Sequence, residues 1–307
     1  MPAIDRVLRS NIKLRHLQLL VALDQFRHLG RTAEFMSVSQ PAVSKMLTEV
    51  ESMLDATLFE RSTRGTEPTA AGHSLVRFAR SVLADYERTR DEIASTRSGA
   101  AGRTRVGAMV VALPVLLAKA VAKLKKHAPQ ATVLVEEGDL TRLLPKLRLG
   151  EIDLFVGRLE PGYAAPDLVT EKLFAEPMVA VVDAGHALSR KARPTWADLA
   201  AMPCVLPPPW ASLRVKLEQQ FYKHKLQPPV DVIETASFLA ISTFVRERQA
   251  VAFVARSVGR HFEKQGLFSV LKLPVPVDLP PVGLITVRGR PPTRITEQLM
   301  ACLRGLA

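Results

Sequence analysis

Cysteine is scarce in this chain, because only Cys204 and Cys302 occur among its 307 residues. A framework of structural disulfides is therefore excluded, and we expect a reducing, cytoplasmic location. Long hydrophobic runs are also missing: the longest uncharged apolar stretch, Val106–Ala118, is too short to span a bilayer and contains Pro114. No apolar signal-peptide core follows the first residue, so we expect neither export nor a membrane partner.

Acidic residues are fewer than basic ones. Thirty Asp and Glu stand against 42 Lys and Arg, which gives a formal net charge of +12 and a sequence pI near 10.0. Such a balance is typical of proteins that meet a polyanion. Residues 1–99 hold 14 basic and 12 acidic side chains, however, so residues 100–307 carry +10 of the net charge. If the N-terminal part binds DNA, local pattern rather than bulk charge must provide recognition.

Signatures of catalysis and of metal binding are lacking as well. The seven histidines show no metal-ligand spacing, so we expect no metal. Because there is no Walker loop, dinucleotide fingerprint or Gly-x-Ser-x-Gly elbow, we also expect no cofactor and no enzymatic activity. We interpret Cys204, which lies in an apolar context, as a packed thiol; the alternative is a nucleophile or a redox sensor.

The N-terminal hundred residues have the spacing of helices. Leucines predict a helix over roughly Leu14–Phe26, and a shorter helix follows over Leu29–Met36. Ser39 is a suitable N-cap for a third helix, and Pro41 fits its first turn. Two short helices joined by a tight turn form a candidate helix-turn-helix, with an ordinary solvated surface helix as the alternative.

The polar face of this candidate motif carries the chemistry of DNA recognition. Gln40 can pair with adenine in the major groove, and Lys45 can contact guanine or a phosphate. Nearby arginines would neutralise phosphates or enter the minor groove. The candidate DNA-binding residues are Arg31, Thr32, Ser39, Gln40, Pro41, Ser44, Lys45, Thr48, Arg61 and Arg64.

A turn-rich segment and a long helix come next. Leu58–Arg61 favours a short strand, and the Gly- and Pro-bounded residues after it favour a wing. Thr69 is placed to cap a helix that runs to about Arg97. Apolar residues in this helix recur with heptad spacing, which indicates a seam for self-pairing, with packing on its own domain as the alternative. The predicted seam residues are Leu75, Ala79, Val82, Tyr86 and Ile93.

The small residues Ser98–Gly102 predict a hinge at 98–103, and the pattern beyond it alternates between strand and helix. This succession predicts a parallel α/β sheet with helices on its faces. The expected strands lie at Arg105–Gly107, Thr132–Glu136, Ile152–Gly157, Pro177–Val182, Val230–Glu234, Val251–Val254 and Val282–Val287. The expected helices start near Pro114 and span Leu140–Leu149, Leu213–Lys225, Phe238–Arg248 and Arg294–Leu303.

The N-terminal sequence closely resembles the DNA-binding domain of LysR-type transcriptional regulators. Matching stretches with unbroken spacing are Leu14–Leu17, Gly30–Glu34, Ser37–Lys45, Leu58–Arg61 and Thr69–Gly72. Looser matches to the effector domain of the family include Gly150–Leu154 and Gly185–Leu188. The resemblance places Gln40, Pro41, Ser44 and Lys45 on the recognition helix, and Arg61 and Arg64 in the wing.

The fold that this resemblance implies is of the α + α/β class. It combines an N-terminal winged helix-turn-helix and a long linker helix with a C-terminal two-lobed α/β effector domain resembling periplasmic binding proteins. We expect the winged domain at 12–71, the linker and dimerisation helix at 72–97, the hinge at 98–103 and the effector domain at 104–307. Lobe I would comprise about 104–160 and 270–307, and lobe II about 161–269.

The resemblance also implies a small-molecule effector between the lobes. Ala108–Val111 matches the first contact segment but has no hydroxyl, so its contacts would come from backbone N–H groups, which favour an anion, or from apolar packing. The candidates are Met109, Val110, Val111, Trp210, Ser212, Thr235, Ser237 and Phe238. The alternative is that each of these residues has a structural role, either as a helix cap whose hydrogen bonds are already made or as an aromatic side chain of the core. Gln249–Val251 departs from the Gly-rich turn that is usual in the family.

These expectations describe a LysR-type regulator that binds double-stranded DNA at a promoter, senses a small anionic metabolite and controls a catabolic operon as an activator, with repression as the alternative. The overall sequence pattern most resembles the family branch that controls aromatic-acid or sugar catabolism. The resemblance also implies a homodimer or homotetramer and RNA polymerase as a partner. Two alternatives stay open: a sequence-independent DNA-packing protein, whose binding would fall steeply with salt, and a small-molecule enzyme, which would turn over substrate on residues 100–307.

Overall fold

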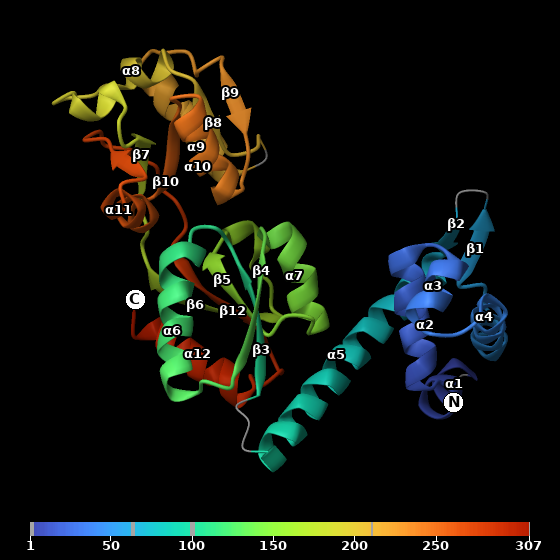
Figure 1. Cartoon of the computed structure of the whole chain (residues 1–307). Helices are drawn as coiled ribbons and strands as arrows, with labels where there is room; N and C mark the ends of the chain where they lie inside the picture. The colour runs from blue at the N-terminus through green and yellow to red at the C-terminus, as the bar shows by residue number, and fades with distance from the viewer. Residues whose placement is uncertain (1–2, 63–64, 99–101, 210, 307) are drawn as a thin grey trace. The chain divides into compact units, whose positions relative to one another are not determined.

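The computed structural model describes residues 3–62, 65–98, 102–209 and 211–306. Their contacts divide the chain into two compact units (Figure 1). The N-terminal unit consists of residues 1–100 together with Arg148–Glu151, and the C-terminal unit consists of the rest. Within the described ranges, no helix combines the length and the apolar character that a membrane span requires.

Five helices and a two-stranded hairpin form the N-terminal unit. These elements are α1 (Ala3–Ser10), α2 (Leu14–Phe26), α3 (Leu29–Phe35), α4 (Gln40–Leu54), β1 (Phe59–Ser62), β2 (Gly65–Pro68) and α5 (Ala70–Ser98). Their core contains Leu19, Leu20 and Leu23 of α2, packed with Val43 and Leu47 of α4. Helix α1, which the sequence did not predict, lies against α4.

Local capping fixes the helix boundaries in this unit. Helix α2 ends at Arg27, whose φ of +52° reverses the chain direction. The side chain of His28 then accepts hydrogen bonds from the N–H groups of Gly30 and Arg31, which caps α3. Ser39 caps α4 through the N–H of Ala42, at 3.4 Å. The predicted helix-turn-helix is therefore present.

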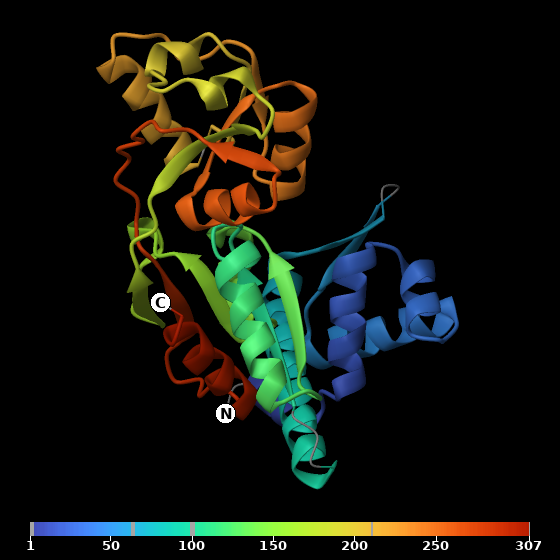
Figure 2. The same cartoon turned by 60° about the vertical axis from the view of Figure 1, so that its left-hand side comes forward.

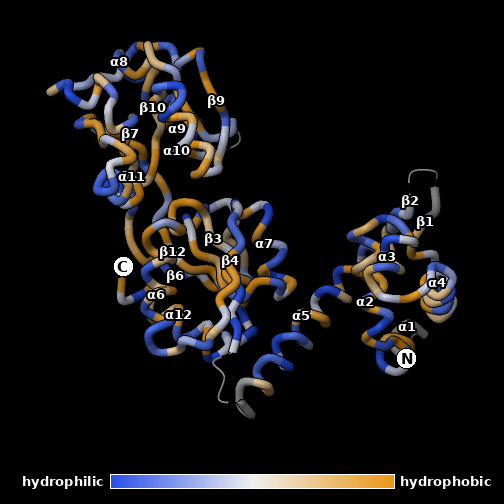
Figure 3. The backbone as a smooth tube through the Cα atoms, in the orientation of Figure 1, coloured by the Kyte–Doolittle hydropathy of each residue, from blue (hydrophilic) through white to orange (hydrophobic). Residues whose placement is uncertain are grey.

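Helix α5 divides into a half that packs on its own unit and a half that does not. Leu75 and Ala79 are buried against α2, and Val82 packs at the edge of the same core. Tyr86 and Ile93 are 46% and 57% exposed, in a stretch that is mainly hydrophilic (Figure 3). The prediction of one continuous pairing seam was thus wrong for Leu75 and Ala79, because the leucines of α2 cover them.

The C-terminal unit contains two five-stranded sheets. The first sheet has the order β4-β3-β5-β12-β6, and we call it and its helices lobe I. Its strands are β3 (Arg103–Ala108), β4 (Thr132–Glu137), β5 (Leu154–Arg158), β6 (Leu168–Phe174) and β12 (Val282–Val287). Its helical elements are η1 (Leu113–Leu117), α6 (Ala118–His127), α7 (Leu140–Leu149), η2 (Pro161–Tyr163) and α12 (Arg294–Arg304). Helices α6 and α12 pack side by side on one face (Figure 2), and α7 covers the other.

The second sheet has the order β11-β7-β10-β8-β9, and we call it and its helices lobe II. Its strands are β7 (Met178–Asp183), β8 (Cys204–Leu206), β9 (Val232–Glu234), β10 (Val251–Ala255) and β11 (Phe268–Val270). Its helical elements are η3 (Ala187–Arg190), α8 (Trp196–Ala200), α9 (Ser212–Lys223), α10 (Phe238–Glu247) and α11 (Arg256–Lys264). Residues of α8 and α9 pack on one face of the sheet, and residues of α10 and α11 on the other.

Both sheets are mixed rather than parallel, which corrects the expectation from sequence. Strand β12 runs antiparallel to both β5 and β6, and β7 runs antiparallel to β10. The reason is the connectivity, since the chain enters lobe II after β6 and returns to lobe I from the opposite direction before β12. The pairing of β6 with β12 also places residues 168–174 in lobe I, whereas we expected lobe II to begin near 161.

Candidate DNA-binding surface and effector-binding segments

Helix α4 separates its polar and apolar residues onto opposite faces. Val43, Leu47 and Val50 are buried in the core of the N-terminal unit. The other face leaves Gln40, Pro41, Lys45 and Thr48 exposed and Ser44 half-buried, and Arg31 of α3 is exposed as well. The structure therefore presents most of the predicted recognition residues to solvent.

Three predicted contact hydroxyls have partners within the protein. Thr32 has no exposed surface and donates from Oγ1 to the carbonyl of His28 at 2.9 Å, so it differs from our expectation and belongs to the helix framework. Ser39 is occupied as the cap of α4. The hydroxyl of Thr48 donates to the carbonyl of Ser44 at 3.1 Å, which leaves its oxygen as an acceptor.

The hairpin β1–β2 has the form of the predicted wing, with Phe59 opposite Pro68 and Ser62 opposite Gly65. Its first strand is anchored to α4, because Glu51 Oε1 accepts hydrogen bonds from the N–H groups of Leu58, at 2.8 Å, and Phe59, at 3.2 Å. The side chain of Arg61 and the whole of Arg64 lie outside the described residues.

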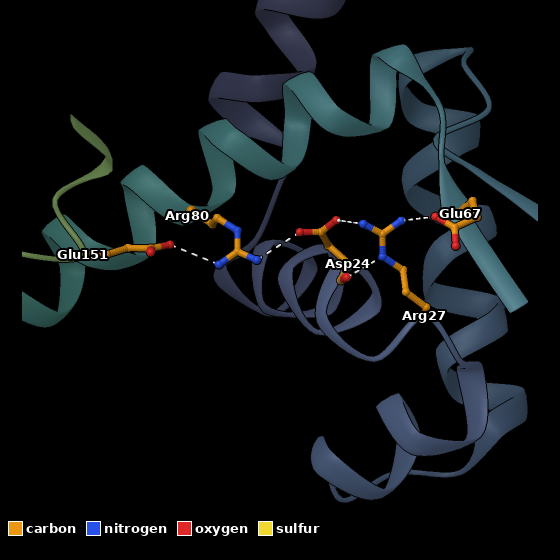
Figure 4. A network of polar contacts seen from close by, with 5 residues as sticks. All are labelled: Asp24, Arg27, Glu67, Arg80 and Glu151. Carbon is orange, nitrogen blue, oxygen red and sulfur yellow. Dashed lines mark hydrogen bonds and ion pairs between the residues drawn. The ribbon is translucent and has the colours of Figure 1, made fainter. Parts of the chain in front are cut away.

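A charged network that the sequence analysis missed connects the wing, α2 and α5 (Figure 4). Arg27 contacts Asp24 at 2.8 Å and Glu67 of the wing. The second oxygen of Asp24 accepts from Arg80 of α5 at 2.9 Å, and Arg80 also reaches Glu151 at 3.1 Å. Burial alone would lower the pKa of Arg80, but the hydrogen bonds to these two carboxylates raise it.

The first candidate effector segment follows β3 and lies against β5. Met109, Val110 and Val111 are half-buried. A Cβ at Gly157 would lie 2.7 Å from Met109 Cγ, so the glycine lets the methionine pack over the strand. The sulfur of Met109 accepts a contact from the N–H of Arg158 at 3.4 Å. Val111 packs against the cores of both lobes, which places this segment where the lobes meet.

The other candidate segments come from lobe II. Ser212 is the first residue of α9 and donates to Glu160 of lobe I at 3.0 Å, so its hydroxyl bridges the lobes and does not cap the helix. Ser237 caps α10, and Thr235 Oγ1 accepts from the N–H of Ser237. Phe238 stacks on Phe262 with centroids 4.6 Å apart, so its ring joins the core of lobe II. The predicted contact Trp210 lies outside the described residues.

Arg158, at the end of β5, holds the two connections between the lobes. Its guanidinium donates to the carbonyl of Glu176 at 2.8 Å and to that of Pro280 at 2.7 Å, one on each connection. The residue is only 6% exposed, and burial lowers its pKa although the nearby Glu176 and Glu160 oppose that effect. Sequence patterns could not single out this arginine, since its partners are 18 and 122 residues away.

The structure explains the departure at Gln249 and bears on the interpretation of Cys204. Gln249 adopts a φ of +50°, the conformation that a glycine usually provides, and its side chain bonds to the carbonyl of Arg246. Cys204 is buried, and this burial raises the pKa of its thiol to about 12. A thiol protonated at neutral pH is a poor nucleophile, which favours the packed-thiol interpretation. Within the described ranges, no group of three or more His, Cys, Asp or Glu side chains could hold a metal ion.

The fold and its exposed residues define a class of protein: a winged helix-turn-helix joined by a long helix to a two-lobed α/β domain. Family models agree with this definition. The model of the LysR substrate binding domain matches residues 97–307, and that of the bacterial regulatory helix-turn-helix protein of the lysR family matches residues 14–73. The chain belongs to the LysR family of DNA-binding transcriptional regulators.

Relatives support this assignment over 97% of the chain, and a solved structure shares the fold. The HTH-type transcriptional regulator GbpR of Azospirillum brasilense is 32% identical and covers 97% of this chain and 87% of its own length. The regulator PcaQ of Agrobacterium fabrum is 28% identical, with 97% and 96% covered. The crystal structure of CbnR, a LysR family regulator, has a TM-score of 0.72 at 19% identity and covers 96% of this chain and 99% of its own. Such relatives are regulators, which points away from an enzyme.

Proposed function

We propose that the exposed face of α4 reads a promoter sequence in the major groove, with Gln40 and Lys45 at base edges and Ser44 and Thr48 as adaptable partners. Arg31, together with the wing residues Arg61 and Arg64, would contact the phosphates or the minor groove. The observation that carries this proposal is the exposure of this polar row on a capped helix, opposite a buried apolar row. A structural neighbour, CbnR, has been solved in complex with its target DNA.

The C-terminal unit would sense a small metabolite where lobes I and II meet, and would control a catabolic operon in response. An anionic metabolite is supported by the net charge of residues 100–307 and by the buried cationic side chain of Arg158, a residue whose backbone N–H contacts the sulfur of Met109. The proposed effector contacts are Met109, Val110, Val111, Trp210, Ser212, Thr235, Ser237 and Phe238. The effector would shift the equilibrium between two arrangements of the protein only to the extent that it binds one of them more tightly than the other.

The DNA-binding proposal is tested by footprinting the region upstream of the gene in the presence of excess competitor DNA. A regulator should keep a discrete protected region, because specific binding exceeds nonspecific binding by orders of magnitude. Uniform protection that disappears steeply with added salt would instead identify a DNA-packing protein.

The effector proposal is tested by a thermal-shift screen of small carboxylates against neutral sugars of similar size. A ligand at 100 times its Kd should add about 2.7 kcal/mol to the free energy of unfolding. Stabilisation by carboxylates and not by sugars is the expected result, and the reverse would reject the anionic class. Turnover of any stabilising compound would favour the enzyme alternative.

The protein would act as a homotetramer built from dimers and would recruit RNA polymerase as an activator. The exposed Tyr86 and Ile93 on α5 are the residues that we assign to the dimer contact. Each dimer would contact two half-sites about one helical turn apart.

A further inference from the structure

The wing lies in close contact with the turn between α2 and α3. The N–H of Thr66 donates to the carbonyl of Arg27 at 2.9 Å. Gly65 has a φ of +131°, and a Cβ there would lie 2.6 Å from the same carbonyl oxygen. Strand β2 therefore begins where only glycine allows the approach, and its position depends on how the Arg27 turn is held.

One carboxylate holds that turn and α5 together. Asp24 accepts from Arg27 on Oδ1 and from Arg80 on Oδ2, and Arg27 also donates from Nε to the backbone carbonyl of Asp24. The side chain of Asp24 is 15% exposed, against 61% for Glu67 at the wing end of the network (Figure 4). Because Asp24 is the most shielded of these charges, its ion pairs are screened less by salt than those of a surface pair.

We propose that Asp24 is a positioning residue for DNA binding, which fixes both the wing and helix α5 relative to α2. Without its negative charge, the guanidinium groups of Arg27 and Arg80 would face each other with no shared counter-charge. Arg27 would then hold Glu67 less firmly, and the wing would lose its fixed position beside the recognition helix. This inference builds on the DNA-binding function of the family and needs no particular effector.

The test compares Asp24→Asn with Glu151→Gln, two changes of carboxylate to amide that raise the net charge equally. Both carboxylates contact Arg80, but only Asp24 contacts Arg27. Hydroxyl-radical footprints and the salt dependence of binding are measured on the footprinted promoter. With Asp24→Asn, we expect loss of the protection that flanks the major-groove contacts and affinity lower by about fivefold, the upper range for one such pair.

The slope of log K against log salt should also become shallower, by about 0.9 for each phosphate contact that the wing no longer makes. Glu151→Gln should retain the flanking protection and the slope. A domain that is merely less stable would lose affinity without a change of slope. The proposal is overturned if Asp24→Asn and Glu151→Gln give the same footprint and the same slope.

A second variant keeps the test decisive if Asp24→Asn does not fold. Glu67→Gln changes an exposed side chain of the wing and leaves the contact between Asp24 and Arg80 in place. We expect it to reproduce the loss of flanking protection and the shallower slope. An unchanged footprint with Glu67→Gln would contradict the role of the network in positioning the wing.

Discussion

Individual side chains in the N-terminal unit fall into two groups that the sequence alone does not separate. Gln40 and Lys45 are exposed and available to a partner, whereas Thr32 is buried and bonded to a carbonyl of its own helix start. Both groups lie within the stretch that resembles the family motif. Resemblance therefore identifies the motif, and burial assigns the role of each residue within it.

Gln40→Ala should weaken binding to the cognate site by roughly 1–3 kcal/mol and relax the preference at one base pair, because a bidentate amide contact is lost. Competition binding against sites changed at single positions measures both effects. An unaltered base preference would show that Gln40 does not read the sequence.

Arg31→Ala should instead weaken binding to cognate and unrelated DNA alike and reduce the salt slope by about 0.9, as expected for one phosphate contact. Salt titrations on both DNAs give the measurement. A loss confined to the cognate site would assign Arg31 to base recognition.

At the scale of elements, helix α5 serves two purposes in succession. Its first half completes the core of the N-terminal unit through Leu75 and Ala79, and its second half exposes Tyr86 and Ile93. A heptad pattern cannot distinguish these uses, since the same spacing supports packing against a neighbouring helix of the same chain or of another.

Tyr86→Asp should therefore affect self-association, whereas Leu75→Ala should affect the stability of the N-terminal unit. A charge at the exposed Tyr86 should dissociate the assembly and leave the thermal stability of the N-terminal unit largely intact. Truncation of the buried Leu75 should cost about 2–5 kcal/mol of stability and preserve self-association at low temperature. Light scattering and thermal unfolding separate the two outcomes. If Tyr86→Asp leaves the assembly intact, the interface lies elsewhere on the protein.

Helix α8 gives a pH prediction. Hydrogen bonds from Lys191 and Thr195 lower the pKa of Asp198 from its usual 3.8 to about 2. A lowered pKa in the folded state means that Asp198 contributes stability above about pH 4, and that this contribution is lost as the pH falls towards 2. Asp198→Asn should flatten the stability profile between pH 4 and 2. Lys191→Met should flatten the profile in large part. Acid-unfolding curves of the unchanged protein and Asp198→Asn that superimpose would reject the effect.

At the scale of the whole molecule, the buried guanidinium of Arg158 donates hydrogen bonds to both connections between the lobes of the C-terminal unit. Arg158→Met should leave the carbonyls of Glu176 and Pro280 without these donors, at a cost of about 1–3 kcal/mol for each group that stays buried. Lysine has no planar fork that could reach both carbonyls, so the stability of Arg158→Lys should lie between those of the unchanged protein and Arg158→Met. Urea unfolding measures both, and equal stability of all three proteins would contradict this role.

Local signals in the sequence were sufficient for much of this architecture. Ser39, Pro41 and the leucine spacing predicted the helix-turn-helix, and apolar runs predicted most strands. Long-range contacts were not predictable: the direction of β12, the place of β6 and the pairing of Asp24 with Arg80 depend on residues far apart in the chain. Among the candidate sites, exposed residues of α4 followed from motif and spacing, whereas the bridge from Ser212 to Glu160 requires the folded lobes.

The place of β12 in lobe I has a consequence during synthesis. The N-terminal unit is built almost entirely from the first hundred residues, but the sheet of lobe I stays open between β5 and β6 until residues 282–287 have been made. At typical rates of translation, roughly 10 to 40 s separate the two events. A nascent chain therefore acquires its N-terminal fold well before the sheet of lobe I is complete, and in that interval it exposes two strand edges on which chaperones, proteases or other copies can act.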